Sequence, residues 1–242
     1  MSEDRVPQPE WDVSGVAEEG AARIVCEFHD LYCHSRGRTL MNTFWLGVGL
    51  IKCPFDLWAY QEILFRLRPD VIVETGTDRG GSAYFMATMC DLIGLGRIIT
   101  IDAGTVPDRP RHPRITYVPG SSLDADIVEA VEKSIAPDEK VMVVLDANHD
   151  RDHVLEEMRT YGPLVSEGSY MIVEESNLNS LRPQDRRRPG PLEAIKDFIA
   201  EDDRFEIDRS REKFFVTFNP SGYLRRRSAA ESSEGAAAEA AA

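Results

Sequence analysis

Short apolar runs alternate with amphipathic stretches from residue 71 to residue 219 of this 242-residue chain. The runs are VIVETGT, RIITIDA, ITYVPGS, KVMVVLDAN and SYMIVEES, followed by FEIDR and KFFVTFN. Near-continuous apolar strands that alternate with helices indicate a parallel sheet covered on both faces. The pattern therefore predicts an α/β domain with a doubly wound, Rossmann-like sheet.

The ends of this domain follow from the same pattern. FEIDR and KFFVTFN lie close together, so we expect them to form a hairpin that adds a C-terminal antiparallel strand. Residues 20–66, which include TFWLGVGLIKCP, have apolar positions at helical spacing and predict an N-terminal helical cap. We expect one domain over residues 20–227, with its α/β core at 67–227. The low-complexity ends, residues 1–19 and 228–242, are expected to be disordered.

Composition limits the classes of partner. Acidic residues outnumber basic ones 42 to 28, which argues against a nucleic-acid partner, because phosphate neutralisation needs clustered Lys and Arg. The four cysteines form no CxxC pair, so neither a zinc ribbon nor a disulfide framework is indicated. No apolar run approaches the roughly 20 residues that cross a bilayer, and no signal peptide is evident. We expect a cytoplasmic protein without a membrane partner.

A glycine-rich loop follows the first predicted core strand, in the stretch VIVETGTDRGGSA. Gly76, Gly80 and Gly81 permit close approach of a ligand, and a helix that starts near Gly81 offers free N–H groups to an anion. Asp102 ends the next strand, 28 positions after Glu74, where an acid can accept both ribose hydroxyls. These features resemble the S-adenosylmethionine site of class I methyltransferases. The spacing differs from GxGxxG, but a nicotinamide-dependent oxidoreductase is an alternative.

The residues expected to bind the cofactor come from four strand ends and the loops that follow them. They are Glu74, Thr75, Gly76, Thr77, Gly80, Ser82, Asp102, Ser121 and Asp146.

Carboxylates also end two later strands. Asp146 follows KVMVVL, and Glu174 and Glu175 follow SYMIV, 28 positions further on. Adjacent parallel strands would bring these acids to one rim of the sheet, where they would repel each other unless a cation lies between them. Oxygen ligands of this kind suit a hard divalent ion, most simply Mg²⁺. Solvated acids at the rim are the plainer alternative.

The segment that follows Asp146 contains further candidates. His149 is expected to act as a base beside the metal, or alternatively to begin a helix without a catalytic role. If the segment is helical, His149 and His153 could instead face one zinc ion. Asn148 could be a metal ligand or a turn former, and we favour the turn.

The stretches KCPFDLWAYQEILFRLRPDVIVETGTDRGGSAYFMA and VVLDANHDRDHVLEEMRTYGPLVSEGSYMIVEES resemble the cephalosporin hydroxylase/methoxylation-protein family, to which rhamnosyl and macrolide-sugar O-methyltransferases are related. The resemblance covers roughly residues 40–220. It implies a Mg²⁺-dependent, S-adenosylmethionine-using O-methyltransferase of secondary metabolism that forms homo-oligomers. It also implies metal ligands at Asp146, Glu174 and Glu175 and a catalytic base at His149.

This chain departs from the family pattern at two positions. Glu175 stands where Asp is common, and Asp146-Ala147-Asn148-His149 replaces a loop that commonly reads DSDH. The expected acceptor is a hydroxyl of a small natural product, first of all on a sugar. A non-catalytic, cofactor-binding partner protein of a β-lactam hydroxylase/methoxylation system is an alternative. The basic segment Leu181 to Arg188 could form a lid over the acceptor or a solvated loop.

Overall fold

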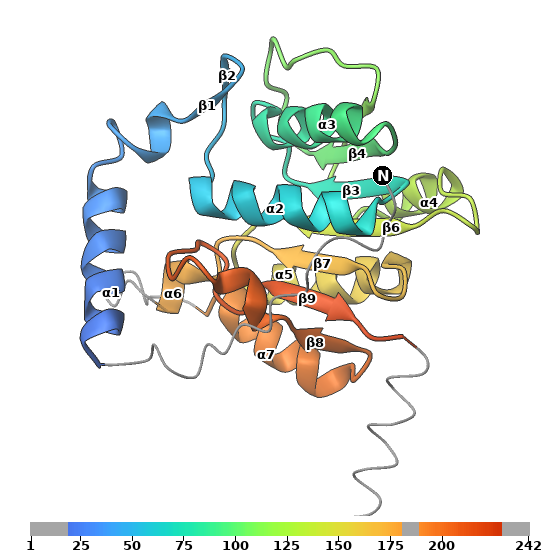
Figure 1. Ribbon diagram of the computed structural model, residues 1–242. Helices are drawn as coiled ribbons and strands as arrows, with labels where there is room; N and C mark the ends of the chain where they lie inside the picture. The colour runs from blue at the N-terminus through green and yellow to red at the C-terminus, as the bar shows by residue number, and fades with distance from the viewer. Residues whose placement is uncertain (1–18, 181–188, 229–242) are drawn as a thin grey trace, which may run out of the picture.

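The computed structural model describes residues 19–180 and 189–228 (Figure 1). The ends expected to be disordered therefore lie outside the described residues, except for Glu19 and Ser228. The candidate lid, Leu181 to Arg188, also lies outside them.

Seven strands form the central sheet, in the order β5-β4-β3-β6-β7-β9-β8. The parallel strands are β3 (Val71–Thr75), β4 (Arg97–Asp102), β5 (Ile115–Pro119), β6 (Val141–Leu145) and β7 (Tyr170–Val173). At the C-terminal edge, β9 (Tyr223–Arg226) pairs antiparallel with both β7 and β8 (Phe205–Ile207). The sheet confirms the predicted α/β class, with the parallel strands where the apolar runs placed them.

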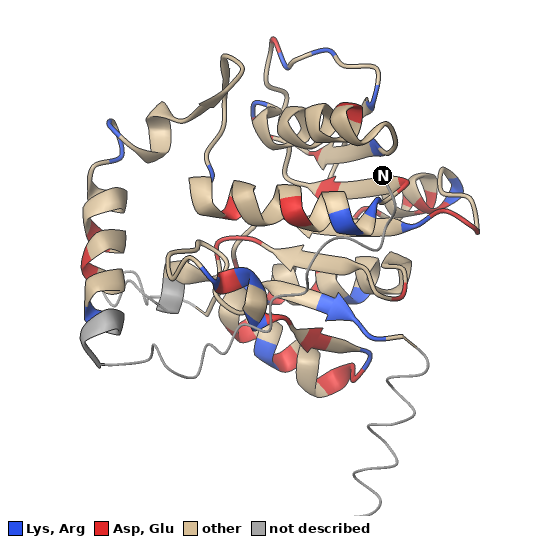
Figure 2. Ribbon diagram, viewed as in Figure 1, with Lys and Arg blue, Asp and Glu red and all other residues tan. Residues whose placement is uncertain are grey.

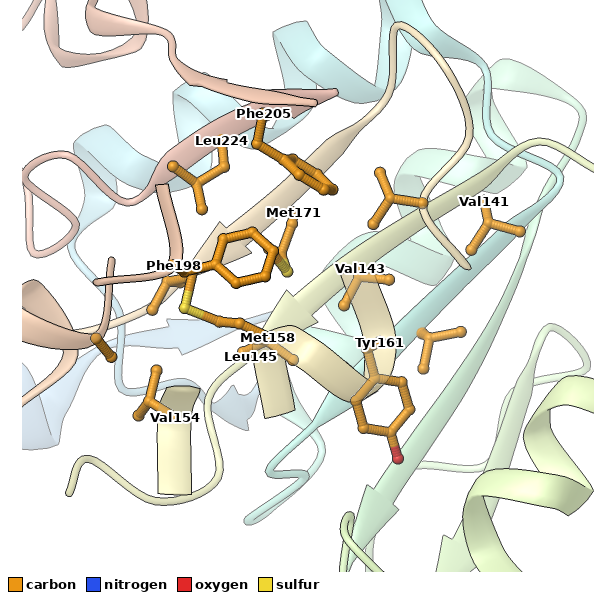
Figure 3. Close-up of a cluster of buried hydrophobic side chains, with 14 of the residues drawn as sticks. Val141, Val143, Leu145, Val154, Met158, Tyr161, Met171, Phe198, Phe205 and Leu224 are labelled. Carbon is orange, nitrogen blue, oxygen red and sulfur yellow. The ribbon is translucent and has the colours of Figure 1, made fainter. Parts of the chain in front are cut away.

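Helices cover both faces of the sheet, as expected for strands whose side chains are buried on both sides. On one face Ile72 packs in a cluster with α2 (Pro54–Leu67) and α3 (Gly81–Ile93). On the other face its neighbours Val71 and Val73 pack with α4 (Ala125–Lys133), α5 (Arg151–Tyr161) and α7 (Pro191–Glu201). Figure 3 shows part of this second cluster, where side chains from β6, α5 and α7 meet.

The closing hairpin forms with a different second strand from the one predicted. FEIDR supplies β8, but KFFVTFN is not a strand, and its expected partner position is taken by residues Tyr223–Arg226. Thr217 Oγ1 and the Phe218 amide instead donate hydrogen bonds to the buried carboxylate of Asp56, at 2.5 and 2.8 Å. Phe218 also packs with Cys33 and Leu40 of the N-terminal segment. The apolar residues of KFFVTFN therefore join that segment to the core.

The N-terminal segment is only partly the predicted helical cap. It contains α1 (Glu19–His34), a 3-10 turn (Leu40–Asn42), a hairpin of β1 (Phe44–Trp45) and β2 (Val48–Gly49), and then α2 (Figure 1). TFWLGVGLIKCP is thus not helical, because Leu46 and Gly47 have positive φ values of 46° and 85° and reverse the chain. Moreover, α2 is part of the helical layer on the sheet and not of a separate cap.

Three short helical elements complete the described chain: η4 (Gly162–Leu164), α6 (Asn177–Ser180) and η6 (Arg209–Glu212). Acidic and basic positions are mixed along α2 and α7 (Figure 2). Among the described residues, no helix is both long and apolar enough to span a membrane.

Candidate active site

The predicted site residues lie where β3, β4, β5, β6 and β7 end, at one rim of the sheet. The chain runs from β3 outward to β5 and then crosses to β6 on the other side of β3, so the strand order reverses between β3 and β6. Open α/β sheets bind ligands outside such a reversal. A pocket of about 530 Å³ lies there, lined by Gly76, Asp102, Ser121, Asp146 and Glu175 among others.

The glycine loop after β3 is held against the end of β6. Gly76 has a φ of +84°, and a Cβ there would lie 1.9 Å from the Asp146 carbonyl oxygen. The Asp146 amide in turn donates to the Thr75 carbonyl oxygen at 3.0 Å. A glycine is therefore needed at position 76 because the loop packs directly on the backbone at Asp146, whether or not a ligand binds there. As predicted, α3 begins at Gly81, directly after Gly80 in a left-handed conformation.

Beneath the loop lies a buried polar cluster. Thr100 Oγ1 donates to Glu74 Oε2 at 2.6 Å and lies 2.7 Å from Thr77 Oγ1. Burial raises the pKa of Glu74 to about 7, although Ser82 and Thr100 hydrogen bonds oppose the rise. Among the described residues, Glu74 Oε1 has no hydrogen-bond partner. This buried cluster thus stabilises the loop through the side chains of Glu74, Thr77 and Ser82. Contact of these side chains with a cofactor stays a prediction.

Asp102 stands at the end of β4 and faces the pocket. Its carboxylate accepts hydrogen bonds from the Asp78 amide at 2.8 Å, the Gly104 amide at 2.7 Å and Arg109 Nη2 at 2.7 Å. These donors fix the orientation of the acid that we predicted for the ribose. Sequence reasoning missed Arg109, which lies in a loop without a recognisable motif.

Two of the predicted metal ligands meet a buried lysine. Lys52 Nζ lies 2.9 Å from Asp146 Oδ2 and 2.9 Å from Glu174 Oε1, and its side chain is 4% exposed. The Tyr60 hydroxyl donates a further hydrogen bond to Glu174 Oε1. The cation that the acids require is therefore supplied in part by the chain itself. Lys52 is the residue that sequence reasoning missed most clearly.

The ion pairs set the charges of these groups. Burial alone would lower the pKa of Lys52, but Asp146 and Glu174 outweigh it and hold this pKa well above its usual range. Burial would likewise raise the pKa of Asp146, but Lys52 and His149 hold it below its usual range. Both groups are therefore ionised at neutral pH.

His149 lies between the remaining carboxylate oxygens. Its Nε2 is 3.5 Å from Asp146 Oδ1, and its Nδ1 is 3.7 Å from Glu175 Oε2. Burial lowers the pKa of His149, but the nearby carboxylates of Asp146 and Glu175 produce a net rise. Burial, together with repulsion by Asp146 and Glu174, raises the pKa of Glu175 despite attraction by His149. His149 Nε2 is buried and has no hydrogen-bond partner in the described part of the chain.

The structure separates the two histidines of the zinc alternative. His149 precedes α5 and faces Asp146 and Glu175, whereas His153 lies within α5 beside Glu157. Asn148 Oδ1 accepts the Asp150 amide at 2.8 Å, which is the predicted turn. Within residues 19–180 and 189–228, no three His, Cys, Asp or Glu side chains are positioned as a ready metal-ligand set.

The strand order becomes 3-2-1-4-5-7-6 when β3 is counted as the first core strand, and together with the antiparallel β9 it defines a class I methyltransferase fold. A solved structure described as "cmcI-D160 Mg-SAM" shares this fold with a TM-score of 0.59, at 23% identity over 78% of each chain.

A family model, Rhamnosyl O-methyltransferase/CmcI, matches residues 38–227. The rhamnosyl O-methyltransferase of Mycobacterium tuberculosis (strain ATCC 25618 / H37Rv) is 36% identical over 208 residues, which are 83% of this chain and 84% of the relative. The relative of the same description from Mycobacterium leprae (strain TN) is 35% identical over 232 residues, 93% of this chain and all of the relative. The chain belongs to the Rhamnosyl O-methyltransferase/CmcI family.

The protein is therefore an S-adenosylmethionine-dependent O-methyltransferase. This confirms the resemblance inferred from the two motif stretches. The alternative of a nicotinamide-dependent oxidoreductase is wrong, because the family transfers methyl groups.

Proposed function

We propose that the protein methylates a sugar hydroxyl of a glycosylated small natural product, in a reaction that depends on Mg²⁺. The observation that supports it best is the convergence of His149 and three carboxylates at the rim of the pocket. The names of the mycobacterial relatives favour a rhamnosyl group as the first acceptor to test.

The donor set fits a hard divalent cation in its chemistry. Asp146, Glu174 and Glu175 together contribute three negative charges, and Lys52 returns one positive charge, so two more would make the set neutral. Lys52 uses one oxygen of Asp146 and one of Glu174, which leaves Asp146 Oδ1, Glu174 Oε2 and the Glu175 carboxylate as candidate ligands. A bound Mg²⁺ would supply Lewis acidity that lowers the pKa of the acceptor hydroxyl.

The chain's own residues would complete the reaction. S-adenosylmethionine would supply the methyl group, and the glycine loop and Asp102 are the parts of the chain that would hold it. His149 accepts the hydroxyl proton, and Asp146 and Glu175 on either side of its ring stabilise the imidazolium that results. The fixed loop and strand ends hold donor and acceptor in attack geometry. This lowers the activation barrier, because translational and rotational entropy is lost on binding and not in the chemical step.

The test is methyl transfer to a rhamnoside, followed by mass spectrometry. We expect transfer that requires Mg²⁺ and stops in excess EDTA, and a loss of about 10²- to 10⁴-fold in His149→Ala. His34→Ala, an exposed histidine at the end of α1, is the matched control and should retain full activity. Turnover that persists in EDTA would remove the metal from the mechanism. Cofactor binding without transfer to any hydroxylated glycoside would favour the non-catalytic partner protein.

We also propose a homo-oligomer. Apolar side chains are exposed on α1 at Ile24 (67%) and Leu31 (66%), and in the β1–β2 hairpin at Leu46 (70%). Contact between copies would remove such surface from water. Light scattering coupled to size-exclusion chromatography tests this, and a mass of one chain at micromolar concentration would contradict it.

A further inference from the structure

A buried carboxylate lies in α5, outside the set that the proposed mechanism uses. Glu157 is fully buried, and both of its carboxylate oxygens have no hydrogen-bond partner among the described residues. An ionised carboxylate in such a place is costly unless a cation compensates it. His153 Nε2, one helical turn earlier, lies 3.6 Å from Glu157 Oε1 and is itself buried.

The other edge of His153 faces the pocket. His153 lines the same 530 Å³ pocket as Asp102, Ser122 and Ala147, and its side chain is 25% exposed. Because Nε2 is buried beside Glu157, the accessible ring nitrogen is Nδ1. The adjacent carboxylate of Glu157 raises the pKa of His153, although burial opposes the rise. In its protonated form, which the Glu157 carboxylate favours, the ring presents a positively charged N–H donor to the pocket.

The position of this donor indicates which part of a ligand it meets. Asp102 marks the ribose, and the base attached to that ribose must lie among the loops that follow β4, β5 and β6. Ser122 and Ala147 belong to two of these loops. Tyr161 ties α5 to the first of them, because its hydroxyl donates to the Ser122 carbonyl at 2.6 Å. Glu157 and His153 stand on the same helix.

We propose that His153, held by the buried Glu157, is a cofactor-binding residue that donates a hydrogen bond from Nδ1 to a ring nitrogen of the adenine of S-adenosylmethionine. Adenine offers acceptors at N1, N3 and N7, whereas its exocyclic amine is a donor and does not match. The proposal rests on the cofactor placement under Proposed function.

The experiment is calorimetric titration with S-adenosylhomocysteine, without acceptor. Loss of a hydrogen bond from a charged donor should weaken binding about 10- to 100-fold in His153→Ala. Glu157→Gln, which keeps the histidine but removes its counter-charge, should weaken binding several-fold. His34→Ala should bind like the unmodified protein. Thermal melting verifies folding, and His153→Leu, which also lacks a donor, replaces the alanine variant if that variant does not fold.

The 1-, 3- and 7-deaza analogues of S-adenosylhomocysteine identify the contact. In the unmodified protein one analogue should bind about 10-fold more weakly than the parent compound, and in the His153 variant that difference should vanish. An unchanged affinity in the His153 variant would overturn the proposal, and so would a loss of affinity that is coupled to none of the three analogues. If the unmodified protein fails to bind S-adenosylhomocysteine, the cofactor placement itself is wrong.

Discussion

Replacement of Lys52 by Met tests how much the buried ion pairs of the active-site rim contribute to the free energy of unfolding. The change removes an ammonium 2.9 Å from both Asp146 Oδ2 and Glu174 Oε1, in a place where the lysine is 4% and Glu174 is 3% exposed. Removal of one partner from a buried pair costs about 3–5 kcal/mol, because the remaining charge has no compensation. The isosteric methionine leaves the packing volume nearly unchanged, so the loss reports mainly on charge.

Protonation limits this loss, and the limit depends on pH. A carboxyl with an ordinary pKa near 4 takes up a proton at a cost of about 5 kcal/mol at pH 7.5 but only about 2 kcal/mol at pH 5.5. We therefore expect Lys52→Met to lower the free energy of unfolding by about 3–5 kcal/mol at pH 7.5. At pH 5.5 the loss should be about 2 kcal/mol or less, because a proton replaces the ammonium.

Urea unfolding in EDTA at both pH values measures these losses without interference from metal ions. Lys133→Met is the matched control, since Lys133 pairs with Glu129 at 2.6 Å but is 71% exposed, and it should cost less than about 1 kcal/mol. A loss below 1 kcal/mol for Lys52→Met at pH 7.5, or one that does not shrink at pH 5.5, would refute the electrostatic argument.

Three further predictions concern other parts of the fold. Burial, with the charge of Glu174, raises the pKa of Asp56 to about 7, so the native state binds the extra proton between about pH 4 and 7. The free energy of unfolding should fall as pH rises through this window, and Asp56→Asn should flatten that slope in urea titrations; an unchanged slope would contradict the assignment. Gly76→Ala should lower the melting temperature strongly, because its Cβ would lie 1.9 Å from the Asp146 carbonyl oxygen. The control Gly94→Ala has a similar φ of +82° but nothing within 4 Å, so it should cost only about 1–2 kcal/mol. Equal shifts of the two variants in scanning fluorimetry would disprove the close contact. Arg109→Gln should weaken S-adenosylhomocysteine binding several-fold in calorimetry, because Asp102, the acid proposed to bind the ribose, loses one of its three donors. Unchanged affinity would remove Arg109 from the site.

The core was predictable from the sequence because the four inner parallel strands, β3, β4, β6 and β7, are buried on both faces and therefore read as near-continuous apolar runs. The acids of the site were predictable for a related reason: parallel strands end at a common rim, so Asp146 and Glu174, which follow the neighbouring strands β6 and β7, had to lie near one another. The prediction of the core and the prediction of the strand-end acids both follow from local patterns along the chain and need no knowledge of contacts between distant segments.

What escaped prediction depends on contacts between distant segments. Lys52 lies 94 residues before its partner Asp146, in a segment whose apolar spacing indicated helix. A single lysine inside the run WLGVGLIKCPF was the available signal, because a charge there needs a buried counter-charge. KFFVTFN has strong strand propensity, yet its hydrogen bonds to Asp56 hold it outside the sheet.

The long span of the Lys52 ion pairs affects how the protein is made. Glu174 follows Lys52 by 122 residues, so the ribosome, at about 5–20 residues per second, completes the second partner roughly 6–24 s after the lysine. During that interval the ammonium lacks one of its two carboxylate partners, so the full set of ion pairs cannot form. The complete set of Lys52 ion pairs must therefore form late in synthesis. A chain that ends before residue 174 can form only the pair between Lys52 and Asp146.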